Sequence, residues 1–138
     1  MLNHLQSAWD VDRAIACEED KLVAVRFGNP STPECARIDE MLRKVEHSLS
    51  NYVIIYVVDI GKVPDFNQMY ELFDAYAIMF FYRKKHIMID LGTGNNNKIN
   101  FQISKQDFID VCETIYRSAS KGKGSAVSIK NFGAKNKY

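Results

Sequence analysis

Three cysteines and three histidines are the residues of this sequence best suited to redox or metal chemistry. Cysteine can act as a nucleophile, form a disulfide or bind a metal, and histidine can bind a metal or transfer protons. No pair of cysteines forms Cys-x-x-Cys, and no cluster of cysteine and histidine has the spacing of a zinc site. We therefore expect no metal, no cofactor and no disulfide framework, as in a protein of a reducing compartment. The residues concerned are Cys17, Cys35, Cys112, His4, His47 and His86.

The pattern of apolar residues predicts the elements that position these side chains. Residues 22–27 and 52–60 are short, mostly apolar runs, which are typical of strands buried on both faces. Between them, residues 33–48 repeat apolar side chains at helical spacing, with Thr32 at the N-cap and Pro33 at the first helical position. Two buried strands joined by a helix predict a right-handed parallel β-α-β unit.

Shorter helices are expected before and after this unit. Asp10 is a suitable N-cap for the first, which would bury Trp9, Ala14 and Ile15. A second short helix is expected within residues 64–73, with Phe66, Met69, Tyr70 and Phe73 on one side.

The second half of the chain predicts a hairpin followed by a helix. Residues 77–82 and 86–91 read as strands separated by only three residues, which is too short for anything but a hairpin. Residues 92–100 form a loop of glycine, asparagine and threonine. Ser104 then caps an amphipathic helix that ends at the glycines of positions 122 and 124.

A parallel β-α-β unit followed by an antiparallel β-β-α unit is the thioredoxin-like arrangement. We therefore predict an α/β, thioredoxin-like fold, with a mixed four-stranded sheet and helices on both faces. Residues 1–120 are expected to form the thioredoxin-like domain, and residues 121–138 a basic C-terminal tail.

This arrangement places one cysteine where redox enzymes of the same fold carry their thiol pair. In those enzymes Cys-x-x-Cys opens the helix, whose N-terminus lowers the pKa of the attacking thiol. Here Thr32 replaces the attacking thiol, and only Cys35, the resolving position, remains. Glu34 beside it would raise the pKa of this thiol.

Two further groups needed for thiol-disulfide exchange are missing. The position of the buried carboxylate in the first strand corresponds to Arg26, and the position of the cis-proline before the third strand corresponds to Ala77. We therefore expect no enzyme activity and no catalytic residue. A packed, structural Cys35 is favoured over a single-thiol reaction.

Charge is unevenly distributed along the chain. The first 120 residues contain 13 basic and 17 acidic side chains, a net charge of −4, whereas residues 121–138 contain five lysines and no acid. Such a tail can contact a polyanion on its own, although a solvated terminus has the same composition. The predicted hairpin tip, Arg83 to Lys85, is also basic and can contact phosphate.

The loop from Gly92 to Lys98 superficially resembles a phosphate-binding loop. It lacks the spacing Gly-x-x-x-x-Gly-Lys-Ser/Thr, so a tight contact loop that presents backbone and amide groups is the preferred interpretation. On grounds of exposure we predict that a partner or RNA contacts nine residues: Arg83, Lys84, Lys85, Asn95, Asn96, Asn97, Lys98, Lys121 and Lys123.

Composition sets the remaining limits. The chain has 138 residues, of which 46% are hydrophobic and 25% charged, as in an ordinary globular domain. No apolar run approaches the roughly 18 residues of a membrane span. The first nine residues do not resemble a signal peptide, so we expect a soluble intracellular protein.

Two long segments, residues 63–74 and 78–100, resemble a known family. The second contains the compositionally unusual run His86-Ile-Met-Ile-Asp-Leu-Gly-Thr-Gly-Asn-Asn-Asn-Lys-Ile-Asn100. It is similar to the Dim/Dib family of thioredoxin-like proteins of the U5 snRNP and the spliceosomal tri-snRNP. The resemblance runs from about His4 to Tyr138.

This resemblance implies a non-catalytic pre-mRNA splicing factor of the nucleus, a structural spacer in the spliceosome before its activation. It implies contacts with the large U5 scaffold protein, with the helical-repeat protein that bridges the tri-snRNP, and with snRNA or pre-mRNA near the 5′ splice site. The sequence departs from the family in the loop 29–32 and at Tyr76, where relatives carry a second cysteine. A disulfide from Cys35 to that strand, conceivable in relatives, cannot form here.

Two other functions stay open at this point. One is a thioredoxin-like thiol-disulfide oxidoreductase, which the missing Cys-x-x-Cys argues against. The other is a splicing-associated paralogue of the same fold, although the run 92–100 favours the principal member of the family.

Overall fold

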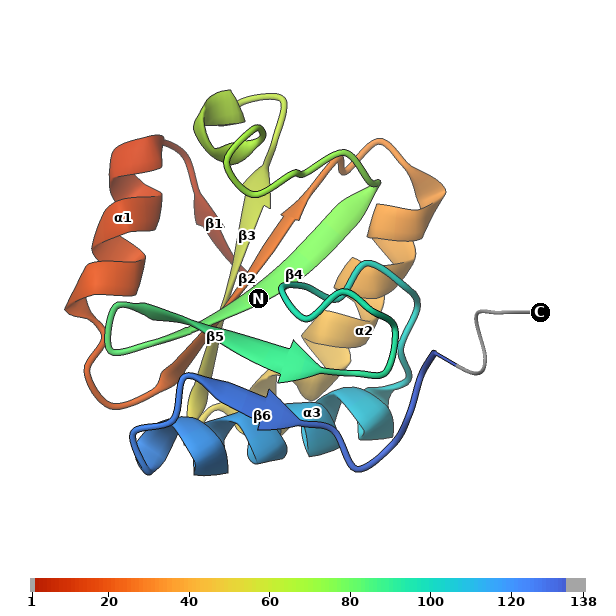
Figure 1. Cartoon of the computed structure of the whole chain (residues 1–138). Coiled ribbons are helices and arrows are strands. Elements are labelled where there is room, and N and C mark those ends of the chain that lie inside the picture. Colours follow the sequence, from red (N-terminus) through yellow and green to blue (C-terminus); the bar gives the residue numbers. More distant parts are fainter. Residues whose placement is uncertain (1, 134–138) are drawn as a thin grey trace.

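A mixed six-stranded sheet runs through the computed structural model, which describes residues 2–133 (Figure 1). The spatial order of the strands is β1-β3-β2-β4-β5-β6. β1, β3 and β2 are parallel to one another, β4 is antiparallel to β2 and β5, and β6 is parallel to β5. The strands are β1 (Asn3–Leu5), β2 (Leu22–Gly28), β3 (Val53–Asp59), β4 (Tyr76–Tyr82), β5 (Lys85–Asp90) and β6 (Ser125–Val127).

The prediction of a mixed sheet is confirmed, but the predicted number of strands is too low. The four predicted strands are the central ones, β3, β2, β4 and β5. The two additional strands, β1 and β6, lie at the edges and have only three residues each. A strand that short carries no alternating pattern long enough to be recognised in a sequence.

The parallel β-α-β unit forms as predicted. All residues of β2 are buried, and each pairs with a residue of β3. Between these strands lies helix α2 (Pro33–Leu49). At its N-terminus the Thr32 hydroxyl oxygen accepts a hydrogen bond from the backbone N–H of Cys35 at 3.2 Å, so Thr32 is the N-cap.

The hairpin between β4 and β5 has the tight turn expected from its short connection. Arg83 and Lys84 both have positive φ, 47° and 76°. Two consecutive left-handed residues fit the twist of adjacent antiparallel strands, which explains why a loop of two residues suffices.

Helix α3 (Lys105–Ser120) begins as predicted, because the Ser104 hydroxyl accepts a hydrogen bond from the backbone N–H of Asp107 at 3.2 Å. After the helix the chain returns to the sheet as β6, and Phe132 is buried in the core. The folded domain therefore extends beyond residue 120, where the sequence placed the start of a tail. Of the tail lysines, Lys135 and Lys137 lie outside the described residues.

Side chains on the two faces of the sheet form two separate cores. Along β4, Ile78 and Phe80 pack toward α2 and α3, whereas Met79 and Phe81 pack toward the opposite face. That face is covered by helix α1 (Ala8–Cys17) and by the segment after β3 (Figure 1). Helices on both faces, as predicted, explain why β4 is apolar at every position.

The start of α1 differs from the prediction. Ser7, not Asp10, is the N-cap, and its side chain accepts a hydrogen bond from the backbone N–H of Asp10 at 3.1 Å. Trp9 is 64% exposed, with the Arg13 guanidinium 4.7 Å from its ring centroid, and Val11 is the residue that α1 buries fully. Ala8 and Ile15 are partly buried beside Val11, so the side of α1 that faces the sheet includes Ile15, as predicted, but not Trp9.

The segment from 64 to 73 is less helical than predicted. Only Pro64–Phe66 is helical, as a single 3₁₀ turn, and turns follow it. Phe66 stacks on Tyr70 inside the core, with ring centroids 5.8 Å apart. Met69 and Phe73 are exposed, so they do not share one side with buried Phe66 as predicted.

No helix among residues 2–133 has the length and apolar character needed to cross a bilayer.

Candidate functional site

A buried ion pair occupies the position at which redox enzymes of this fold carry a carboxylate. Arg26 of β2 donates from Nε to Asp39 Oδ1 at 2.8 Å and from Nη2 to Asp39 Oδ2 at 2.7 Å. Its Nη1 donates to the carbonyl oxygen of Val58 on β3 at 3.1 Å. The side chains of Arg26 and Asp39 are only 3% and 10% exposed. A guanidinium has N–H donors and no acceptor, so it cannot replace a carboxylate as the group that accepts the proton of a thiol.

The Cys35 thiol lies next to this ion pair and is fully buried. Its burial raises the pKa to about 11, and the nearby charge of Arg26 offsets that rise only in part, while Asp39 and Asp59 add to it. The thiol is therefore protonated at neutral pH. Gly28 is required beside it, because a Cβ there would lie 2.7 Å from the Cys35 sulfur and 3.0 Å from Arg26 Nη1.

Cys35 is not bonded to a second thiol among the described residues. Tyr76, which stands where relatives carry a cysteine, is buried, and its hydroxyl has no hydrogen-bond partner within residues 2–133. Burial raises the pKa of this phenol well above its usual range. Cys112 is buried in α3 and Cys17 is exposed on α1, and all three cysteines are free. The prediction that the thiol-exchange machinery is missing is consistent with this geometry.

Side-chain hydrogen bonds connect chain segments near Cys35. Gln102 Nε2 donates to the carbonyl oxygen of Glu34 at 3.0 Å, and Asn100 Nδ2 donates to Asp74 Oδ2 at 2.9 Å. These bonds fasten the segment before α3 to the start of α2 and to the turn before β4. The bonds and the burial of the thiol leave no open approach to Cys35.

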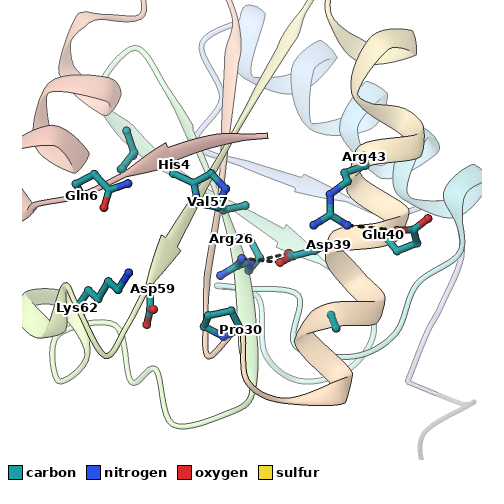
Figure 2. Close-up of a pocket in the computed structure, with 12 residues that line it drawn as sticks. His4, Gln6, Arg26, Pro30, Asp39, Glu40, Arg43, Val57, Asp59 and Lys62 are labelled. Carbon is teal, nitrogen blue, oxygen red and sulfur yellow. Dashed lines mark hydrogen bonds and ion pairs between the residues drawn. The ribbon is translucent and has the colours of Figure 1, made fainter. Parts of the chain in front are cut away.

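A hollow of ≈ 470 Å³ opens on the outer side of the ion pair (Figure 2). Each of its other two carboxylates has a partner: Glu40 pairs with Arg43 at 3.3 Å, and Asp59 accepts from the backbone N–H of Gly61 at 2.9 Å. No group of three potential metal ligands occurs among residues 2–133. The described lining of the hollow thus contains no such group of metal ligands. Its polar lining residues are His4, Gln6, Arg26, Asp39, Glu40, Arg43, Asp59 and Lys62.

Four of the predicted contact residues, from two distant segments, line one hollow. Arg83 and Lys85 come from the hairpin, Lys121 and Lys123 follow α3, and the hollow between them has a volume of ≈ 300 Å³. No acidic residue of the described chain lines it. We call these four residues and the space between them the basic hollow. The sequence pointed to the two segments separately and gave no sign that they meet.

The Arg83 side chain is held in a defined position at the rim of the basic hollow. Its Nε donates to the carbonyl oxygen of Glu19 at 3.1 Å, and its guanidinium lies 5.2 Å from the ring centroid of Tyr82. Arg83 also lines a neighbouring hollow, together with Lys84, Glu18, Glu19 and Asp20. Lys84 lines this acidic hollow and not the basic one, so it is a weaker candidate for binding an anion than Lys85, Lys121 and Lys123. The same acids offset part of the charge of Arg83.

The loop after β5 is only partly available for contacts. Asn96 and Asn97 are exposed and Asn95 is half-buried, with its Oδ1 accepting from the backbone N–H of Asn97 at 3.0 Å. The prediction that Lys98 is an exposed contact is wrong, because its side chain is buried, at 5% exposure.

The ammonium group of Lys98 has a structural role instead. Its Nζ donates to the carbonyl oxygens of Tyr70 at 2.8 Å and Glu71 at 2.5 Å. Hydrogen bonds to both carbonyls compensate the burial of the charge. Lys98 thereby fastens the loop after β5 to the turn before β4, and its charge is not presented to a partner.

The fold and the site define a thioredoxin-like protein that lacks the thiol pair. Chloroplastic thioredoxin z has the same fold, with a TM-score of 0.67 at 17% sequence identity, over 83% of this chain and 93% of that structure. The family described as "Mitosis protein DIM1" matches residues 1–132. This chain belongs to that family.

Two curated relatives illustrate the family relationship. The mitosis protein dim1 of Schizosaccharomyces pombe is 53% identical over 138 residues, which cover 99% of this chain and 97% of that protein. The spliceosomal protein DIB1 of Candida glabrata is 55% identical over 128 residues, which cover 92% of this chain and 90% of that protein. The resemblance to the Dim/Dib family and the thioredoxin-like fold are thereby confirmed.

The buried ion pair predicts a large loss of stability on removal of one partner. We expect Asp39→Ala to lower the free energy of unfolding by about 3–5 kcal/mol, because it leaves the Arg26 charge buried and unpaired. Glu40→Ala on the same helix removes only exposed ion pairs, with Arg43 and Lys44, and is expected to cost about 1 kcal/mol or less. Urea denaturation measures both. Equal losses for the two variants would contradict the structural role of the pair.

The raised pKa of Cys35 predicts slow alkylation. At pH 7 iodoacetamide should modify exposed Cys17 much faster than Cys35, whose thiolate becomes abundant only as the pH approaches 11. Mass spectrometry of peptides from the native protein distinguishes the two sites within one sample, so Cys17 is the internal control. Modification of Cys35 at the rate of Cys17 would show that its thiol is activated.

Proposed function

We propose that this protein is a non-catalytic pre-mRNA splicing factor that acts in the spliceosome by binding. The observation that carries this proposal is its membership of the DIM1 family, in which a relative named spliceosomal protein DIB1 is 55% identical to it. The paired Arg26 and the buried Cys35 support the non-catalytic part, because they occupy the place where a redox enzyme needs a free base and a reactive thiol.

Within the spliceosome, we place the protein in the U5 snRNP and the tri-snRNP, in the nucleus. Its partners would be the large U5 scaffold protein and the helical-repeat protein that bridges the tri-snRNP. The two-core fold suits a structural spacer that holds the complex before activation, because binding alone can stabilise one arrangement of a larger assembly. The resemblance of residues 63–74 and 78–100 to the Dim/Dib family supports this placement.

For the contact with snRNA or pre-mRNA near the 5′ splice site, we propose the basic hollow. Phosphate contacts of this kind position a protein on RNA without reading its sequence. Its four cations, with no acid in the described lining, provide a local positive charge on a domain that is otherwise acidic. The exposed amides of Asn96 and Asn97 remain candidates for a separate partner contact, together with half-buried Asn95 and with Lys84.

Purification of the tagged protein from nuclear extract tests this function. At moderate salt we expect the small RNAs of the tri-snRNP to be enriched together, since a stable component brings the whole particle with it. Sequencing of the co-purified RNA measures this. A clean monomer without these RNAs would contradict the splicing assignment, and reduction of insulin by that monomer would establish an oxidoreductase instead.

Charge reversal in the basic hollow tests its role in binding RNA. We expect Lys121→Glu with Lys123→Glu to weaken association with the particle and to reduce its salt sensitivity. For each phosphate that the variant no longer binds, the slope of log affinity against log salt should become shallower by about 0.7–0.9. The matched control is Lys62→Glu with Lys105→Glu, which changes the net charge equally at two exposed lysines elsewhere. If both pairs leave the slope unchanged, or change it equally, Lys121 and Lys123 make no specific phosphate contact.

A further inference from the structure

Strand β6 forms an edge of the sheet, with one row of backbone groups that no other strand among residues 2–133 pairs with. Toward β5, the N–H of Met88 donates to the carbonyl oxygen of Gly124 at 3.1 Å, and the N–H of Ser128 donates to that of Asp90 at 2.8 Å. Because backbone groups alternate in direction along a strand, the N–H and C=O groups of Ser125 and Val127 point away from β5. They form a short template for an additional strand.

Apolar side chains accompany this free edge. In the register of β5 and β6, Met88 lies opposite Ser125, and Val127 lies two residues further along on the same exposed face. Met88 is 42% exposed, Val127 70% and Ile129 93%. Placed beside a free strand edge, these apolar side chains can receive apolar side chains of an added strand. We call them the apolar strip.

There is also room beside the chain that continues from β6. A hollow of ≈ 220 Å³ lies between α3 and the segment after β6, and Val111, Ile129 and Phe132 contribute to its lining. An added strand along the free edge would therefore lie beside a surface that is partly apolar and partly charged, because Asp107, Asp110 and Glu113 of α3 line the same hollow.

We propose that the β6 edge binds an extended segment of another spliceosomal protein by strand addition. The outward groups of Ser125 and Val127 would form the main-chain hydrogen bonds, and the apolar strip would receive alternate apolar side chains of that segment. This inference rests on the proposed function only in naming the assembly from which the partner comes. It adds a protein-binding site to the proposed RNA contact at the basic hollow.

The length and chemistry of the edge favour this occupant over the alternatives. Charge does not decide between them, because the acids Asp107, Asp110 and Glu113 lie beside Arg117 and Lys130, and Lys130 pairs with Asp107 at 2.9 Å. A second copy would contribute a β6 of only three residues and bury far less area than a stable dimer needs, whereas an extended segment can follow the chain past Ile129. RNA offers no ladder of amide groups and would leave the apolar strip exposed.

The variant Val127→Pro tests the free edge selectively, because it leaves the pairing of β6 with β5 intact. Proline at this position removes an N–H that points outward, and edge strands tolerate it for that reason. In the particle purification we expect Val127→Pro to reduce the recovered tri-snRNP RNA about tenfold, because a hydrogen bond and the alignment of the added strand are removed. Val127→Ile keeps the N–H and the apolar side chain, so it should retain the particle.

The thermal unfolding of Val127→Pro is measured alongside, to establish that it is folded. If it is not, Val127→Lys with Ile129→Lys serves the same purpose, because charged side chains also block strand addition at an edge. Retention of the particle at the wild-type level by a folded edge variant would overturn the proposal.

If the wild-type protein itself recovers no particle, the proposed function fails, and the β6 edge is then tested by cross-linking.

A photoreactive benzoylphenylalanine in place of Ile129 identifies the occupant directly in nuclear extract. We expect one cross-linked protein other than this chain, attached through a segment of alternating apolar residues, and loss of that cross-link when Val127→Pro is added. A cross-link to RNA or to a second copy of this chain would overturn the proposal, as would a protein cross-link that Val127→Pro leaves unchanged.

Discussion

The charge of Arg26 lies inside the fold, and the surrounding structure is arranged to accommodate it. A buried guanidinium is tolerated only when a carboxylate neutralises it and acceptors receive its N–H groups. Asp39 on α2 and the carbonyl oxygen of Val58 on β3 meet this requirement, so one side chain of β2 fixes three elements of the β-α-β unit relative to one another. Glycine is required at position 28, because Arg26 and Cys35 fill the space that a Cβ there would occupy.

This constraint also explains why the site is unsuited to thiol-disulfide exchange. An enzyme of that kind needs a base, a low-pKa thiol and a second thiol at this place, and the chain has a paired cation, a thiol whose pKa is raised to about 11, and Tyr76. The candidate binding sites of the fold lie on its surface instead. The basic hollow and the β6 edge are both formed where the hairpin and the chain after α3 come together.

The central elements could be predicted because their signals are local. Buried strands are continuously apolar, and the caps at Thr32 and Ser104 mark helix starts through hydrogen bonds within one turn. The failures have a different physical origin. β1 and β6 exist only through pairing with distant strands, and Lys98 is buried because carbonyls some 27 residues earlier in the chain accept its N–H groups. The basic hollow likewise depends on the tertiary path of the chain, although its basic residues are all evident in the sequence.

If the protein acts in splicing by binding, splicing does not depend on the Cys35 thiol. The most direct measurement is splicing of a pre-mRNA in nuclear extract depleted of the protein and then supplied with wild type or with Cys35→Ser. Serine nearly preserves the shape of the buried side chain but cannot carry out thiol chemistry. We predict that both proteins restore splicing to the same extent. If Cys35→Ser is folded and enters the particle, yet fails to restore splicing, the thiol takes part in the function and the protein does not act by binding alone.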